Sequence, residues 1–469
     1  MFLKPQIALL FYAVLLFISS SAMAKEKLVL TLDKSVDIAF EKNPEIQMAE
    51  KQVAKSRASV WEAYSTILPQ LNVSASYQHS WDIQSNTIPN FVKLMMPPEI
   101  GNIIPAFANM PDYVEIAFGL QNAYRYGATL TQPLYLGGAG VAGVKISRAA
   151  QRASEENLEA KKQNLIYQTA NAFYACLVAQ EIIKVQEEAL AQAETNLSVV
   201  NKKYNVGTAS GFDKMRAQVE VANLKPQVIS ARNNYKSALT GLRVVLGLDK
   251  NADIEVKGSF AYTKDEFGSK TLRELQDMAI ANRPEVKALD EQKYITQKSV
   301  TIARSAFLPK LFFQTDYSYL AMKQNEPISK LAQSDFSKGF TSAISLSIPI
   351  FTGFKNAKHY QKAKLDQKIM LDTSRQLSNG IFAEVEVAHN KYEEAKEKYV
   401  AANKSVDLAR EALRLANMMY DEGANTQLDV LNSQLALRQA RLNYVSSLYE
   451  YQMARYQLRK VTGNLKGVL

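Results

Sequence analysis

The chain has 469 residues and a formal net charge of +10, from 56 Lys and Arg against 46 Asp and Glu. The two signs are interleaved along stretches such as 391–398 (KYEEAKEK), which is typical of a solvated helix face and argues against nucleic-acid binding. A single Cys and three scattered His exclude an internal disulfide framework and a Cys- or His-based metal site.

Residues 1–24 have the layout of a secretory signal peptide. Lys4 provides the positive start, residues 7–18 form an apolar run, and Ala22-Met-Ala ends it with small residues. A run of about a dozen residues is too short to cross a bilayer, which needs roughly 20. We therefore expect the mature chain to begin near Lys25 and to lie beyond the inner membrane.

The mature chain is an internal duplication. The sequence LRELQDMAIANRPE at 272–285 repeats LDKSVDIAFEKNPE at 32–45, an offset of 240, whereas later matches have an offset of 216. The offset falls because the first repeat holds 24 extra residues between Pro69 and Pro133, which we interpret as an exposed loop. The predicted organisation is a first repeat at 25–248, a connector at 249–270 and a second repeat at 271–469.

Each repeat is predicted to run helix, strand, loop, strand, long helix, tight turn, helix. Period-2 alternation of apolar and polar residues places the strands at about 68–81, 122–136, 309–320 and 341–352. Each is long enough for a tilted membrane strand. Four such strands do not close a barrel, and open strand edges in lipid leave amides unpaired, so the sequence predicts an oligomer.

The two long helices are predicted at about 139–206 and 355–422, and each carries an apolar heptad seam. In the second repeat the seam steps by four and three residues from Ile381 to Tyr420. In the first it includes Cys176, which we interpret as a core residue. The long helices end at the tips 207–213 and 423–429, and the return helices extend to 248 and 463.

A glycine-rich sequence, Gly138-Ala-Gly-Val-Ala-Gly143, fits the G-x-G-x-x-G pattern of dinucleotide sites. The helix predicted after it runs about 65 residues, whereas a dinucleotide-binding unit needs another strand within about 30. The chain also offers no nucleophile elbow and no metal-ligand cluster. The sequence therefore predicts no catalytic residue, no cofactor, no metal and no enzyme.

The mature chain resembles the TolC-like outer-membrane efflux proteins, or outer membrane factors. The likeness is carried by the duplication, by LTLDKSVDIAFEKNPE from Leu30, by PLYLGG from Pro133, and by the turns YNVGTASGFD from Tyr204 and YDEGANTQLDVL from Tyr420. The resemblance implies an α+β membrane protein. Its homotrimer would form a 12-stranded β-barrel in the outer membrane, four strands per chain, continued by a long α-helical coiled-coil barrel in the periplasm.

The implied function is the exit duct of a tripartite efflux or type I secretion system. The implied partners are a periplasmic adaptor (membrane fusion) protein, an inner-membrane RND, ABC or MFS transporter, and outer-membrane lipid. The competing interpretation is a non-channel periplasmic coiled-coil adaptor or structural envelope protein. Such an adaptor would be expected to carry an inner-membrane anchor or lipidation and soluble β-domains instead of two matched hairpins.

The resemblance places the adaptor contact and the gate at the two helical tips. The implied residues are Tyr204, Gly207, Asp213, Tyr420, Gly423, Asn425, Thr426 and Asp429. Capping is the leading interpretation of the glycines, Thr426 can cap the helix after it, and the two Asp are equally well explained by the helix dipole.

The tips also depart from the pattern of the family. Some relatives have an Arg and a second acidic residue where this chain has Asn425 and Asn432. We therefore expect a gate held by uncharged hydrogen bonds, with a lower cation affinity. The loop at about 82–121, rich in Pro, Met and Ile, is expected to cover part of the outer mouth.

Overall fold

The computed structural model describes residues 27–104, 106, 109–117, 119–262, 267–324 and 326–465, so the predicted signal peptide lies outside the described residues. The chain forms two compact units. Unit 1 comprises the described residues up to Ser56, Ala150–Lys293 and those from Ile369, and unit 2 comprises Arg57–Ala149 and Tyr294–Lys368. Each unit takes elements from both repeats, so the units cut across the repeat boundary.

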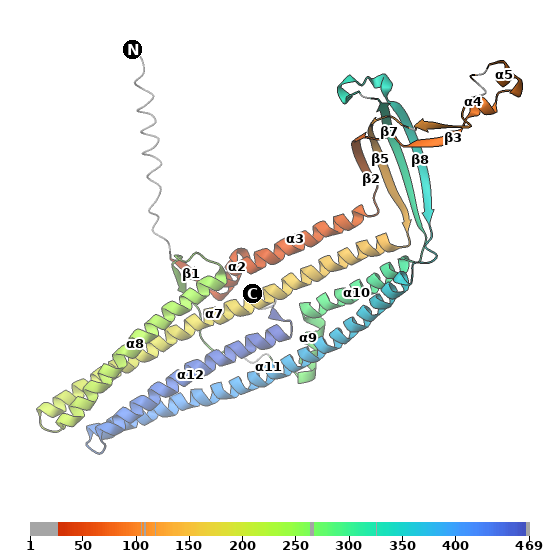
Figure 1. Ribbon diagram of the computed structural model, residues 1–469. Helices are drawn as coiled ribbons and strands as arrows, with labels where there is room; N and C mark the ends of the chain where they lie inside the picture. Colours follow the sequence, from red (N-terminus) through yellow and green to blue (C-terminus); the bar gives the residue numbers. More distant parts are fainter. Residues whose placement is uncertain are drawn as a thin grey trace, which may run out of the picture. The chain divides into compact units, whose positions relative to one another are not determined.

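Unit 2 contains a four-stranded antiparallel sheet (Figure 1). Its strands, in spatial order, are β2 (Gln70–His79), β5 (Asn122–Leu136), β7 (Lys310–Lys323) and β8 (Ser337–Ser347). Val73 and Phe340 lie on one face and are 79% and 71% exposed, whereas Thr129 and Asp316 are hydrogen-bonded on the other face. The sheet therefore has one strongly apolar surface and one polar surface, as the alternation predicts.

Strand β8 differs from the prediction of about 341–352. It begins at Ser337 and ends at Ser347, which pairs with Lys310, the first residue of β7. Pairing with β7 therefore ends there, and Pro349 two residues later lacks an amide donor. The alternating apolar residues after Ser347 do not extend the strand.

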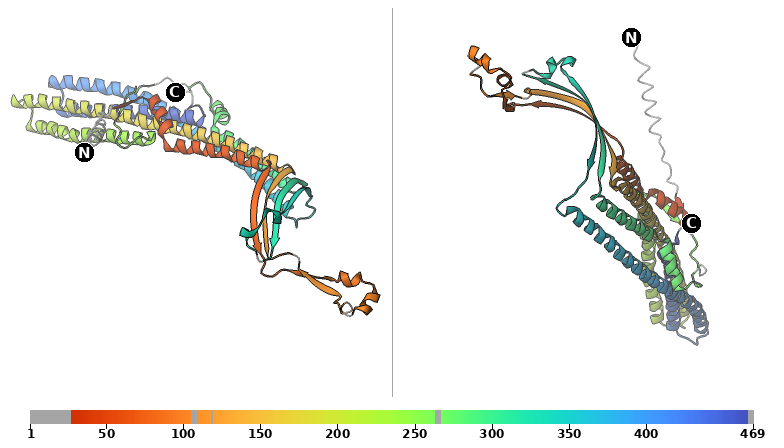
Figure 2. Two further views of the ribbon diagram at one scale, coloured as in Figure 1. Left: turned by 90° about the horizontal axis from the view of Figure 1, so that it is seen from above. Right: turned by 90° about the vertical axis from the view of Figure 1, so that its right-hand side faces the viewer.

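The extra residues of the first repeat form an arm with its own secondary structure. Strands β3 (Ser85–Pro89) and β4 (Tyr113–Ala117) pair as a hairpin, and short helices α4 (Phe91–Leu94) and α5 (Pro98–Ile103) lie between them. The arm projects from the end of the four-stranded sheet (Figure 2). Asn90 closes it by donating its side-chain amide to the Pro111 carbonyl at 3.0 Å. That the arm covers the outer mouth stays a prediction.

Unit 1 contains most of the helical structure. Its elements are β1 (Leu28–Leu30), α2 (Leu32–Lys42), the start of α3 (Pro44–Ser65), most of α7 (Ala139–Asn205), α8 (Gly211–Leu246), β6 (Ile254–Val256), α9 (Leu272–Asn282), the start of α10 (Pro284–Ser305), most of α11 (Lys355–Asp421) and α12 (Gln427–Val461). Helices α8, α7, α12 and α11 lie side by side in this order (Figure 1). Among the described helices, none is both long and apolar enough to cross a membrane.

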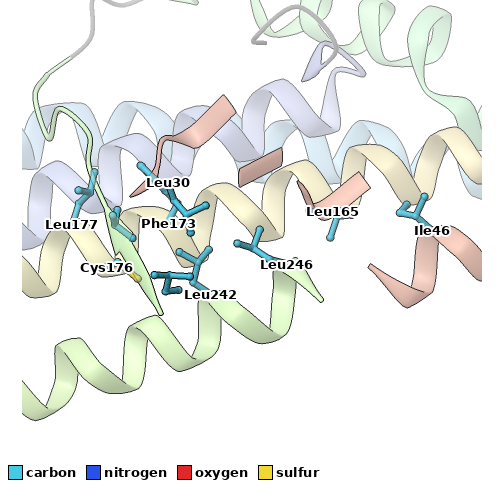
Figure 3. Close-up of a cluster of buried hydrophobic side chains, with 11 residues drawn as sticks. Leu30, Ile46, Leu165, Phe173, Cys176, Leu177, Leu242 and Leu246 are labelled. Atoms are coloured by element: carbon cyan, nitrogen blue, oxygen red, sulfur yellow. The ribbon is translucent and has the colours of Figure 1, made fainter. Parts of the chain in front are cut away.

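The heptad seams predicted on the long helices are buried. On α11 the seam residues Ile381, Val385 and Tyr392 are at most 2% exposed and pack against α12. Helix α7 packs on two sides, with Cys176 in the cluster against α8 (Figure 3) and Ala170 in the cluster against α12. Burial raises the pKa of the Cys176 thiol to about 12, so this Cys is a protonated core residue, as predicted.

Two features of unit 1 were not predicted from the sequence. Strands β1 and β6 form a short parallel pair, and the return helices α8 and α12 end on glycines with positive φ, Gly247 at 66° and Gly463 at 74°. A Cβ on Gly247 would lie 2.6 Å from the Lys42 carbonyl oxygen, and one on Gly463 would lie 2.8 Å from Cβ of Asn282. Each return helix therefore ends in close contact with the end of α2 or α9.

Candidate functional site: the two helical tips

In both tips the chain turns at a glycine with positive φ. Gly207 and Gly423 have φ of 84° and 78°, as their predicted role at the helix ends requires. At the first tip the Lys203 carbonyl accepts from the Thr208 amide at 2.8 Å, and at the second the Met419 carbonyl accepts from the Ala424 amide at 2.8 Å. These bonds close the last turn of α7 and of α11, so each long helix ends just before its glycine.

Each return helix starts with a capping box. The Asp213 carboxylate accepts from the Ser210 amide at 3.2 Å and from its hydroxyl at 2.6 Å, and the Asp429 carboxylate accepts from the Thr426 amide at 3.1 Å and from its hydroxyl. The hydroxyls of Ser210 and Thr426 in turn accept from the amides of the two Asp. Thr426 is a cap as predicted, and both carboxylates take part in helix initiation.

The cap at Asp429 predicts a pH dependence. Hydrogen bonds from the Thr426 hydroxyl and then from its amide hold the pKa of the Asp429 carboxyl below the ordinary 3.8. Because the pKa of Asp429 is lower in the folded state, its ionised carboxyl stabilises the start of α12 fully above pH 3.8. This stabilisation is lost as the pH falls through the folded-state pKa. Hydrogen-exchange protection factors at the start of α12 are expected to fall in this acid range. In Asp429→Asn they should be lower at neutral pH and change little with acid, whereas Glu422→Gln, which removes an exposed carboxylate from the same tip, should follow the wild type.

Lys203, near the end of α7, connects the two tips. Its ammonium donates to the Tyr420 carbonyl at 3.0 Å, lies 3.5 Å from the Asp421 carboxylate, and stands 3.8 Å from the centroid of the Tyr420 ring. This contact joins residues 217 positions apart in the chain. The link between the two tips of one chain is therefore charged. That the gate itself is held by uncharged hydrogen bonds stays a prediction.

The other predicted tip residues divide into two groups. Burial first, and then the negative charges of Asp213 and Asp421, raise the pKa of the Tyr420 phenol, so this side chain stays neutral. Tyr204 and Asn425 make contacts within their own hairpins. Lys214 lies 4.8 Å from the Tyr204 ring centroid, and the Asn425 side-chain oxygen accepts from the next amide at 2.8 Å.

Two sequence features that raise the question of site chemistry, the metal-ligating residues and the glycine-rich segment, can be located in the structure. In the described ranges there is no group of three His, Cys, Asp or Glu that could hold a metal ion. The glycine-rich sequence 138–143 joins β5 to α7, and the next element after α7 is the helix α8. This order is not that of a dinucleotide-binding unit.

Comparisons with known proteins agree on one family. The family model described as outer membrane efflux protein matches residues 36–248 and 275–464. The chain is 21% identical over 429 residues to the outer membrane protein TolC of Vibrio cholerae, covering 91% of this chain and 89% of that one. It is 22% identical over 466 residues to the alkaline protease secretion protein AprF of Pseudomonas aeruginosa, covering 97% and 88%.

Solved structures show the same fold. The CmeC outer membrane channel of Campylobacter jejuni superposes with a TM-score of 0.71 at 20% identity, over 92% of this chain and 85% of that one. The open state of the MtrE outer membrane channel of Neisseria gonorrhoeae gives 0.72 at 19% identity, over 92% and 88%. The chain therefore belongs to the outer membrane efflux protein family, and it is a channel of the outer membrane with a periplasmic helical part, not an enzyme.

Proposed function

We propose that this chain is the exit duct of a tripartite efflux or type I secretion system, which passes substrates from an inner-membrane pump to the exterior. Three copies form one duct, with a 12-stranded barrel in outer-membrane lipid and a helical barrel in the periplasm. A periplasmic adaptor connects the duct to an RND, ABC or MFS transporter. Similarity to a protein named for secretion of a protease supports a secretion role, and the family description supports efflux.

The observation that carries the proposal is a sheet with two unpaired edges. In the described sheet, β2 and β8 each pair with one neighbour only. An unpaired amide in lipid costs several kcal/mol, so both edges need a partner strand. Because the two edges are different strands, copies of the chain join β2 to β8 head to tail, and such contacts close into a ring.

The edge helices of unit 1 support the same assembly. Helix α8 buries Val221 and Leu224 against α7 and exposes a second apolar seam on its opposite face. The members of this exposed α8 seam are Phe212, Met215, Val219, Pro226 and Ile229. At the other edge, α11 exposes Leu408, Leu415 and Met419 at similar spacing. We assign these two seams to the contact between α8 of one copy and α11 of the next.

The test of assembly is the mass of the particle extracted with detergent from carbonate-washed outer membranes, corrected for bound detergent. The wild type is expected to contain three chains. A soluble monomer or dimer in the periplasmic fraction would contradict the proposal and favour the adaptor-like alternative. Ion conductance of the purified particle in a planar bilayer tests the duct itself, and its absence would contradict the channel role.

Charges placed in the exposed α8 seam are expected to break the ring. The double variant Met215→Glu/Val219→Glu buries two carboxylates between helices, which costs several kcal/mol per copy, so the particle should shrink toward one chain. The matched control is Asn223→Glu/Gln227→Glu, which adds the same charges to exposed positions of α8 outside the seam. A control that dissociates as readily as the seam variant would contradict the assignment.

We place the adaptor contact and the gate at the tips 207–213 and 423–429. Exposed apolar side chains at the tips support a protein partner there: Val206 is 73% exposed and Leu428 46%. The two capping boxes support a fixed tip geometry, because they hold the start of each return helix. Gly207 and Gly423 serve the turns, Asp213 caps the first return helix, and Tyr420 accepts the Lys203 contact that joins the two tips.

A further inference from the structure

We propose that Lys203 is a positioning residue that latches the second tip of each chain to the first, and that loss of its contacts favours the open duct. The latch consists of the Lys203 ammonium, the Tyr420 carbonyl and ring, and the Asp421 carboxylate. The gating part of this inference rests on the proposed function of the tips as the gate. The contact itself is independent of that proposal.

The latch supplies a charge that α11 lacks at its end. A helix carries partial negative charge at its C-terminus, where its last carbonyls have no partner within the helix. Helix α11 has no basic residue in its last turn and ends on Asp421, which adds to this negative charge. The Lys203 ammonium lies 3.0 Å from the Tyr420 carbonyl and 3.5 Å from the Asp421 carboxylate, so a cation from α7 stabilises the end of α11.

The backbone of Lys203 is held in place by hydrogen bonds within the first tip. Its carbonyl accepts from the Thr208 amide at 2.8 Å and from the Thr208 hydroxyl at 3.1 Å, so its backbone is part of the first turn. Its side chain is 26% exposed, which limits the water that competes for the ammonium. One residue therefore contacts both turns, through its backbone in the first and its side chain in the second.

The contact is not repeated in the opposite direction, although the chain is a duplication. The residue of the second repeat that corresponds to Lys203 is Met419, at the offset of 216, so the second tip has no ammonium to return. Lys202, the neighbouring residue on α7, carries the same charge but is exposed. Lys203→Met therefore copies the natural residue of the other repeat, and Lys202→Met removes an equal charge one position away.

The first experiment measures the open fraction of purified wild-type, Lys203→Met, Lys203→Arg and Lys202→Met channels in planar bilayers. Lys203→Met is expected to raise the open fraction by about threefold or more, whereas Lys202→Met should match the wild type. Lys203→Arg keeps the cation and should remain close to the wild type. Because salt screens the pair with Asp421, the open fraction should rise with ionic strength more steeply in the wild type than in Lys203→Met.

A second measurement follows the latch without conductance. Hydrogen exchange of the Gly423 and Ala424 amides is expected to be faster in Lys203→Met than in the wild type and in Lys202→Met. Equal exchange in the two Met variants would overturn the latch. Faster exchange without a change in open fraction would overturn its gating role. A wild type that does not conduct would contradict the proposed function, and the exchange data would still decide whether the latch exists.

Discussion

Gly247→Ala is expected to destabilise unit 1 by about 2–5 kcal/mol. The residue ends α8 with φ of 66°, where an L side chain costs about 1–2 kcal/mol. The new Cβ would also lie 2.6 Å from the Lys42 carbonyl oxygen, which is backbone and cannot rotate away, and such crowding costs about 1–3 kcal/mol. The measurement is the apparent melting temperature of the detergent-solubilised protein at a fixed scan rate.

The chain provides a matched control for this substitution. Gly380 lies inside α11, and a Cβ there would meet nothing within 4 Å. Gly380→Ala is therefore expected to stabilise the protein by up to about 1 kcal/mol, since Ala is the better helix former. Gly463→Ala should resemble Gly247→Ala, because it has φ of 74° and a Cβ that would lie 2.8 Å from Asn282. A Gly247→Ala protein that melts like the wild type would contradict the close contact.

The parts of the fold set by periodicity were predictable from the sequence. The heptad seam of α11, from Ile381 onward, is buried where its four-and-three spacing places it. Strand β8 shows the limit of this approach. Alternation continues to Ile350, but a strand needs a partner, and β7 offers none beyond Lys310. Periodicity records which side chains share a face, whereas strand length depends on pairing with a distant segment.

The tips show a similar division. Gly207, Gly423 and Thr426 were predictable because turns and caps depend on residues close in sequence. Lys203 was not, because a Lys in the last turn of a helix normally serves the end of its own helix. Its partners Tyr420 and Asp421 come from the other repeat, and nothing in the spacing along α7 indicates that contact. The β1–β6 pair was missed for the same reason, since each strand has only three residues and its partner is distant.

The largest functional effect is expected from Asn432→Asp, through the affinity of the proposed duct for multivalent cations. Asn432 is exposed and lies one turn after Asp429 on α12, so the two side chains share one face of the helix. In the proposed trimer the wild type presents one acidic ring at the second tip, and Asn432→Asp adds a second. Hard cations gain affinity with the number of carboxylate ligands, so the half-blocking concentration should fall about tenfold or more.

A blocking titration of the conductance with a trivalent cation, carried out on the wild type and four variants, separates the contributions of the two rings. Asp429→Asn should be blocked least, and the wild type and Asp429→Asn/Asn432→Asp should be similar because each keeps one ring. Asn417→Asp, on an exposed position of α11, adds the same charge away from α12 and should resemble the wild type. Equal block of Asn432→Asp and the wild type would mean that residue 432 does not face the pore. Equal block of the wild type and Asp429→Asn would exclude Asp429 from the constriction, and its carboxylate would then serve the cap with Thr426 alone.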